Sequence, residues 1–349
     1  MEYDIVLVTR NRPVILPVSV PLMISQSRPP ANFIIVDSSD DHDTVKRIVG
    51  KLCVSDKSIN FVLLHAEPGT AHQRNVGLKH VNSPVVIFPD DDSLWFPDTA
   101  ASVMRVYEKD IDDKIGGVCA AESAHPPLGS ISRKLYNITL TDGLKRQYHQ
   151  FVYPLLSRYF PDPLYYFEDI LTAPLWLPGE NAIVQGPMAG FRMSFRTDLI
   201  RSMGFDESLG EYALSEDIDA SLGILKKHLI VCAKNARVFH YTFPSRRVDG
   251  KEMGMMQMLN RTYIVCKHNE SCSPARERLV RFLIFRLFVY FLQAGSKYGR
   301  EKFYGSLFAL RYVNRLRHAK AVDLHKTYWS LRNECAMRLG LKHYSKKAA

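Results

Sequence analysis

Three consecutive carboxylates, Asp90, Asp91 and Asp92, follow directly after the apolar run at residues 85–89. The run predicts a buried strand, so the acidic side chains should lie at its carboxyl end. Adjacent carboxylates repel one another unless a cation neutralises them, and Mg²⁺ and Mn²⁺ prefer such oxygen ligands. A solvated acidic turn is the alternative, and the buried type of the preceding strand favours a metal site over it.

A second acidic group, Glu216 and Asp217, stands at the start of a predicted helix. The helix dipole and free backbone amides keep a carboxylate ionised there, and an ionised carboxylate can take a proton from an attacking hydroxyl. Ordinary helix capping is the alternative. His240, at the end of another apolar run, is a suitable Mn²⁺ ligand, although a lone histidine in such a place can also be purely structural.

The elements that must position these residues follow an alternating pattern. Short apolar runs at 4–9, 33–37, 61–65 and 85–89 predict strands, and helical patterns separate them. This pattern predicts an α/β fold with a mostly parallel or mixed sheet flanked by helices. Ligands of such sheets bind at the carboxyl ends of the strands, where this chain carries its polar residues.

The second half of the chain is less regular. Residues 122–180 are rich in Pro and Tyr and predict an insertion beside the site. Helices are predicted from about residue 196 and over 215–227, and two short strands over 229–233 and 237–241. We therefore expect a catalytic-type α/β domain over 1–270 and a helical extension, basic and rich in aromatic residues, over 271–349.

The extension holds most of the positive charge. Residues 275–349 contain 17 Lys or Arg against 4 Asp or Glu, whereas the whole chain has a net charge of +10. Such a tail can meet nucleic acid or anionic lipid, or can be merely solvated. The apolar run at 279–294 contains two arginines and is shorter than the roughly 20 residues that span a bilayer. A helix on a membrane surface and a helix packed on the domain remain alternatives.

The six cysteines and the N-terminus bear on the compartment. The cysteines show no paired spacing for a metal, which predicts reduced thiols. The first residues lack the basic start and apolar centre of a signal peptide. We expect a cytoplasmic protein that can attach peripherally to the inner face of the cytoplasmic membrane.

In order and spacing, these motifs resemble the family 2 glycosyltransferases with the GT-A fold, in their bacterial-type, non-processive form, over roughly residues 3–268. The resemblance is carried by five segments: Val8-Thr9-Arg10-Asn11-Arg12, Ile35-Val36-Asp37-Ser38, the stretch from Gly69 through Arg74-Asn75 to Gly77, Asp90-Asp91-Asp92, and the stretch from Gly190-Phe191-Arg192 to Glu216-Asp217. Asn260-Arg261 matches a further Asn-Arg pair. The Gln-x-x-Arg-Trp motif of processive synthases is absent from the sequence.

The resemblance implies a role for each matched residue. The nucleotide would be bound by Thr9, Asn11, Arg12, Asp37, Arg74, Asn75 and, at the ribose, Asp91. Asp92, Asp90 and, as in some members, His240 would hold Mn²⁺ or Mg²⁺. Asp217 would be the catalytic base, with Glu216 positioning it or the acceptor.

The implied activity is an inverting transfer of a sugar from a nucleotide-diphosphate donor, with UDP favoured, in polysaccharide or glycoconjugate synthesis. The acceptor would be a hydroxyl of a saccharide or lipid-linked glycan, shaped by the insertion. Two alternatives stay open. A sugar nucleotidyltransferase is disfavoured because no early Gly-rich loop with a basic residue is present, and a nucleic-acid-binding protein leaves both acidic groups unexplained.

Overall fold

The computed structural model describes residues 1–53, 59–131, 159–165, 171–243, 248–269 and 273–341. It divides into two compact units. The first unit comprises 1–142 and 167–245, and the second comprises 143–166 and 246–349. The expected division near residue 270 is therefore displaced, because the helix at 250–268 packs with the helices that follow it. Most of the predicted insertion, at 132–158 and 166–170, lies outside the described residues.

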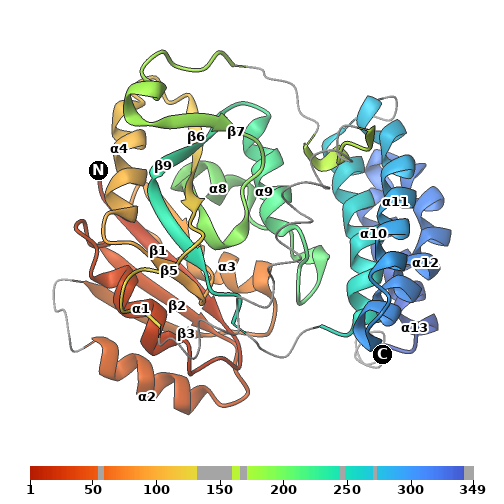
Figure 1. Ribbon diagram of the computed structural model, residues 1–349, viewed down its shortest axis with the longest axis horizontal. Helices are drawn as coiled ribbons and strands as arrows, with labels where there is room; N and C mark the ends of the chain where they lie inside the picture. Colours follow the sequence, from red (N-terminus) through yellow and green to blue (C-terminus); the bar gives the residue numbers. More distant parts are fainter. Residues whose placement is uncertain (54–58, 132–158, 166–170, 244–247, 270–272, 342–349) are drawn as a thin grey trace. The chain divides into compact units, whose positions relative to one another are not determined.

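The first unit is built on a mixed sheet (Figure 1). Within the described residues the sheet has nine strands in the order β3-β2-β1-β4-β8-β6-β9-β5, and β7 pairs with β9. The strands are β1 (Tyr3–Thr9), β2 (Asn32–Asp37), β3 (Asn60–His65), β4 (Val85–Phe88), β5 (Ser93–Trp95), β6 (Ile115–Glu122), β7 (Ala182–Gln185), β8 (Met193–Arg196) and β9 (Leu229–His240).

The four predicted N-terminal strands are confirmed, and burial explains the apolar runs of β1, β2 and β4, whereas β3 is only partly buried. All seven residues of β1 are buried, as are all four of β4. Strands buried on both faces read as continuous apolar runs, which is typical of parallel pairing in the middle of a sheet. β1 pairs in parallel with β2 and β4, and β2 with β3. Their carboxyl ends consequently share one edge of the sheet.

Helices and short 3₁₀ turns connect the strands of the first unit. The helices are α1 (Leu16–Ile24), α2 (His42–Cys53), α3 (Thr70–Leu78), α4 (Thr99–Lys109), α8 (Thr197–Met203) and α9 (Glu216–Leu225), and the 3₁₀ turns are η3 (Leu177–Glu180), η4 (Gly190–Arg192) and η5 (Glu207–Leu209). α3 lies closely on the sheet, because a Cβ at Gly77 would come within 2.4 Å of Val6 Cγ1. Only glycine allows that approach, which fixes the residues of α3 relative to β1.

The two short strands predicted at 229–233 and 237–241 are in fact one strand. β9 runs from Leu229 to His240 and continues through the polar residues between the two apolar runs. In the pairing with β6 the register passes from Ala120 opposite Ala233 to Ala121 opposite Arg237. The extra residues on β9 form a bulge, which interrupts the alternation of apolar residues without ending the strand. β9 thereby carries His240 to the edge where β4 ends.

The second unit is helical: α10 (Gly250–His268), α11 (Pro274–Leu292), α12 (Lys297–Arg317) and α13 (Leu324–Arg338), with the 3₁₀ turns η2 (Pro163–Tyr165) and η6 (Ala321–Asp323). α10 and α12 cross in backbone contact, since a Cβ at Gly254 would lie 2.2 Å from Lys302 O and one at Gly305 2.1 Å from Lys251 O. This contact makes α10 part of the second unit.

The matched Asn260-Arg261 pair lies on α10, inside the second unit. Asn260 Oδ1 accepts a hydrogen bond of 2.7 Å from Tyr328 on α13. Arg261 pairs with Asp162, and its guanidinium lies 5.0 Å from the ring centre of Phe282. Both residues hold helices of this unit together.

α11 exposes several large apolar side chains. Ile284, Phe288, Phe291 and Leu292 are 54–64% exposed. No helix among the described residues is long and apolar enough to span a membrane.

Candidate active site

The acidic turn after β4 points its middle carboxylate into the protein. Asp91 is 4% exposed. Its Oδ2 accepts a hydrogen bond of 2.8 Å from Thr9 Oγ1, and its Oδ1 accepts one of 2.6 Å from Arg12 Nη1. Burial raises the pKa of Asp91 to about 7, although Arg12 opposes the shift. The end of β1 and the end of β4 are joined through this side chain.

The two outer carboxylates and His240 form a compact group of possible metal ligands. One ligand atom from each of Asp90, Asp92 and His240 lies within 4.8 Å of the others. His240 Nε2 is 3.3 Å from Asp92 Oδ1, and the imidazole stacks on the ring of Phe191 at 4.4 Å. Pairing of β5 with β9 sets His240 opposite Ser93, the residue that follows the acidic turn.

Asp92 and His240 each stabilise the charged form of the other. Burial would raise the pKa of Asp92, but the hydrogen bond and the charge of His240 lower it below its ordinary value. Burial would lower the pKa of His240, but Asp92 raises it. Two carboxylates and one imidazole suit a divalent ion such as Mn²⁺, and the oxygen ligands alone also suit Mg²⁺. The donor set therefore fits the predicted metal.

Arg74 of α3 connects the two acidic groups. Its side chain is 1% exposed; Nη2 donates to Asp90 Oδ1 at 3.0 Å, and Nη1 donates to Glu216 Oε1. The guanidinium also lies 5.5 Å from the ring centre of Phe205. A buried arginine with carboxylates on both sides holds a fixed geometry, because its planar head offers paired donors. The acidic turn and the start of α9 thus belong to one network.

Asp217, next to Glu216, faces the backbone of a neighbouring turn. Its Oδ2 accepts a hydrogen bond of 2.7 Å from the Gly190 amide, and its Oδ1 accepts one of 2.8 Å from Ile218 N. Burial raises the pKa of Asp217, with Arg74 opposing. Burial likewise raises the pKa of Glu216 to about 8. Carboxylates with raised pKa values are common where proton transfer occurs near neutral pH.

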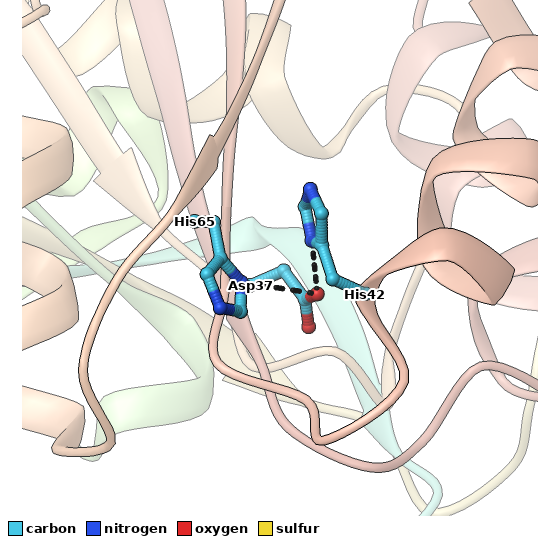
Figure 2. Close-up of side chains that lie close together, drawn as sticks. All are labelled: Asp37, His42 and His65. Atoms are coloured by element: carbon cyan, nitrogen blue, oxygen red, sulfur yellow. Dashed lines mark hydrogen bonds and ion pairs between the residues drawn. The ribbon is translucent and has the colours of Figure 1, made fainter.

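Asn11 and Asp37 meet at a second place on the same sheet edge. Asn11 adopts a positive φ of 56°, its backbone amide donates to Ser39 Oγ at 2.7 Å, and its side chain exchanges hydrogen bonds with Asp40. Asp37 accepts from Ser39 N and Oγ at 3.0 and 2.6 Å. Asp37 also lies 2.7 Å from His42 Nδ1 (Figure 2). These contacts join the turns that follow β1 and β2.

Asn75 stands apart from both groups. Its side-chain amide donates to Phe205 O and to Glu207, and accepts from Phe205 N, each at 2.8 Å. In the part of the chain that the structure describes, these hydrogen bonds direct the amide to the segment before α9. The structure brings together the other predicted residues near the acidic turn: Thr9, Arg12, Arg74, Asp90, Asp91, Asp92, Glu216, Asp217 and His240.

Three residues of the site were not predicted individually. Gly190 holds Asp217 through its amide, Phe191 stacks on His240, and Ser93 links Asp90 N at 3.1 Å to Phe191 O at 2.8 Å. Gly190 and Phe191 stood in the sequence only as part of a longer motif. Their contacts depend on pairings between distant strands, for which sequence spacing gives no signal.

Residues 4–195, more than half of the chain, match the sequence profile of Glycosyl transferase family 2. No curated protein sequence matches the chain.

Solved structures share the fold at low sequence identity. The structure of S. aureus TarS 1-349 has a TM-score of 0.52 and 13% identity over 97% of this chain and 92% of that one. The same TarS fragment in complex with UDP-GlcNAc gives 0.51 and 13%, with the same coverage of 97% and 92%. The mannosyltransferase PcManGT from Pyrobaculum calidifontis, in complex with GDP-Man and Mn²⁺, gives 0.50 and 14% over 98% and 87%.

The predicted fold class, a mixed sheet flanked by helices as in GT-A glycosyltransferases, is confirmed by these likenesses. The match over residues 4–195 decides the family, and this chain is a glycosyltransferase that belongs to Glycosyl transferase family 2.

Proposed function

We propose that the protein transfers a sugar from a nucleotide-diphosphate donor to an acceptor hydroxyl with inversion, using Asp217 as the base and a divalent ion held at the acidic turn. The observation that carries the proposal is the buried Arg74, which joins Asp90 on the metal-ligand side to Glu216 on the acceptor side. One rigid link between the two groups is what a reaction needs when donor and acceptor must meet in one orientation.

The donor proposal rests on the family and on the sheet edge. The solved neighbours carry UDP-GlcNAc in TarS and GDP-Man in PcManGT. We favour a UDP-sugar here, bound along the turns that contain Thr9, Asn11, Arg12 and Asp37. Asp91, whose oxygens are held by Thr9 and Arg12, would lie at the ribose.

Asp92, Asp90 and His240 would hold Mn²⁺ or Mg²⁺. Such an ion supplies positive charge to the diphosphate as the sugar–phosphate bond breaks. Arg12 contacts Asp92 Oδ2 at 3.2 Å, and Arg74 contacts Asp90, so each ligand carboxylate has a cationic partner that orients it. His240 is fixed from the other side by the Phe191 ring.

Asp217 would take the proton from the acceptor hydroxyl. The Gly190 amide holds Oδ2, and burial gives the carboxylate the raised pKa of a stronger base. Glu216, fastened to Arg74, would keep the start of α9 in place while Asp217 acts. Attack on the face of the anomeric carbon opposite the leaving diphosphate inverts that centre in a single displacement.

For the acceptor we favour a lipid-linked glycan, in polysaccharide or glycoconjugate synthesis. The support comes from α11, whose exposed residues Ile284, Phe288, Phe291 and Leu292 lie in a tail rich in Lys and Arg. Apolar side chains beside basic ones are typical of helices that lie on anionic membranes. We therefore propose peripheral attachment at the cytoplasmic membrane surface. Cys119, Cys232, Cys266 and Cys335 are free and buried, which fits a reducing compartment.

The test replaces Asp217 by Asn and measures donor binding and turnover separately. Loss of a general base lowers the rate by roughly 10²–10⁴-fold, whereas nucleotide affinity should stay within about twofold. Asp198→Asn is the control, because that carboxylate is 98% exposed on α8. An Asp217→Asn enzyme with near wild-type turnover would overturn the assignment, and a product that retains the donor's anomeric configuration would overturn inversion.

A further inference from the structure

Three further metal-ligand side chains gather at the sheet edge, on other strands than the acidic turn. Asp37 ends β2, His65 ends β3, and His42 is the first residue of α2 (Figure 2). One ligand atom from each lies within 4.8 Å of the others. The group contains two imidazoles and one carboxylate, a softer set than that of the acidic turn.

The backbone fixes where these ligands stand. Asp37 and His65 are paired in the parallel register of β2 and β3, so their side chains project from neighbouring positions of the sheet. His42 follows Asp37 by five residues, at the start of a helix. Hydrogen bonds from Ser39 N and Oγ hold Asp37 Oδ1, which leaves Oδ2 directed at the two imidazoles. Such outer contacts orient the ligands of metal sites.

The distances between the ligand atoms lie on either side of the value expected around a bound transition-metal ion. Asp37 Oδ2 lies 2.7 Å from His42 Nδ1 and 3.9 Å from His65 Nδ1, and the two rings are 4.4 Å apart at their centres. Ligands at about 2.0–2.1 Å from tetrahedral Zn²⁺ are separated by about 3.3 Å, a value between the two distances. Small side-chain rotations would therefore bring the three atoms around one ion.

The partial exposure of the two histidines would let an ion reach the group from the solvent. Asp37 is fully buried, whereas the side chains of His42 and His65 are 29% and 53% exposed. A fourth ligand, water or another small donor, can reach the ion from the solvent side. This arrangement of three protein ligands with one open position is common for zinc.

We propose that Asp37, His42 and His65 form a second metal site, selective for a transition-metal ion of the Zn²⁺ class over Mg²⁺. Imidazole nitrogen favours Zn²⁺, Cu²⁺ and Ni²⁺, whereas Mg²⁺ prefers a shell made mostly of oxygen ligands. A consequence follows that rests on the proposed function. Because Asp37 belongs to the turns proposed to bind the nucleotide, an ion here would compete with the donor and inhibit transfer.

The test measures metal binding without nucleotide or turnover. Zn²⁺ is titrated into the full chain by calorimetry, and Co²⁺ binding is followed by its visible absorption, for wild type, His42→Ala, His65→Ala and Asp92→Asn. His80→Ala is the matched control, because His80 is an exposed histidine of the same unit. Any Zn²⁺ bound at Asp90, Asp92 and His240 is lost in Asp92→Asn, so that variant isolates the second site. We expect a Zn²⁺ site that remains in Asp92→Asn and His80→Ala and whose affinity falls at least tenfold in the first two variants.

Two results would overturn the proposal: no saturable Zn²⁺ binding to the wild type, or equal binding to the wild type and both histidine variants. Circular dichroism of each variant shows whether it is folded, and His65, half exposed on β3, is the substitution least able to disturb folding. A second titration addresses the consequence: Zn²⁺ should weaken UDP binding to the wild type and not to His65→Ala. Failure of that arm alone would overturn the inhibition and leave both the metal site and the glycosyltransferase site standing.

Discussion

Gly190 packs against the link between the two acidic groups, and the substitution Gly190→Ala tests that packing. A Cβ at this position would lie 3.2 Å from Arg74 Nη2 and 3.5 Å from Asp217 Oδ2. Gly190 needs no unusual backbone for its fold, because its φ is not among the positive values of the glycines. The effect of the methyl group is therefore steric, and it falls on the two side chains that the proposed mechanism uses.

The expected size follows from these distances. Carbon contacts are optimal at about 3.5–4.0 Å, so the guanidinium must move by a few tenths of an ångström. Its hydrogen bonds to Asp90, at 3.0 Å, and to Glu216 restrain it. Overpacking of this kind costs about 1–3 kcal/mol of folding free energy. Because a 1 Å misplacement can cost roughly 10²-fold in rate, we expect kcat to fall on the order of 10-fold.

The assay compares melting temperature and turnover of Gly190→Ala with those of Gly179→Ala, where a Cβ meets nothing within 4 Å. A cycle with Arg74→Lys isolates the contact, because the narrower ammonium leaves room for the methyl group. The second substitution should then cost less in the double variant than alone. If Gly190→Ala behaves like Gly179→Ala, or if the two substitutions are additive, Arg74 is not held against this turn as described.

Two further predictions concern charge and the tail. Burial raises the pKa of Glu216 to about 8, so the folded state keeps a proton that the unfolded state has lost, and Glu216 destabilises the fold increasingly as pH rises from about 4.5 through 8. The stability of Glu216→Gln relative to wild type should therefore increase over that pH range, by at most roughly 5 kcal/mol. Urea unfolding at pH 5 and pH 9 measures this difference, and a difference that does not change with pH would contradict the prediction. The double substitution Phe288→Ser with Phe291→Ser should weaken cosedimentation with vesicles containing phosphatidylglycerol at least tenfold, because each ring would bury apolar area worth about 1.5–3 kcal/mol. The control Val322→Ser changes a 90% exposed residue of the same unit and should leave cosedimentation unchanged. A wild-type protein that does not bind such vesicles would refute membrane attachment.

Much of the sheet could be predicted from the sequence because its central strands are buried on both faces. Mostly apolar runs such as 4–9 and 85–89 are typical of buried strands, and the polar residues that follow them indicated where the acidic turn lies. β9 was predicted as two strands because its bulge interrupts the apolar pattern with polar residues. A bulge is defined by the partner strand, β6, which lies more than a hundred residues away in the chain.

The links within the site could not be predicted for the same reason. Arg74 pairs with Glu216 across 142 positions of sequence, so the spacing of either motif carries no signal of the contact. The resemblance implies that Arg74 and Asn75 face the nucleotide, and it gave no sign of their contacts within the protein: Arg74 pairs with Asp90 and Glu216, and Asn75 with Phe205 and Glu207. The division of the chain before α10 likewise depends on the contact between Gly254 and α12, a property of packing.

The central claim, that a divalent ion at Asp90, Asp92 and His240 binds the donor's diphosphate, is tested most directly by thermal shift. UDP, GDP, dTDP and CDP are titrated with and without Mn²⁺ into wild type and Asp92→Asn. A ligand at about 100 times its Kd stabilises the folded state by about 2.7 kcal/mol. We predict that one nucleotide raises the melting temperature of the wild type only when Mn²⁺ is present, and that Asp92→Asn loses this shift. An equal shift without Mn²⁺, or one that persists in Asp92→Asn, would contradict the account.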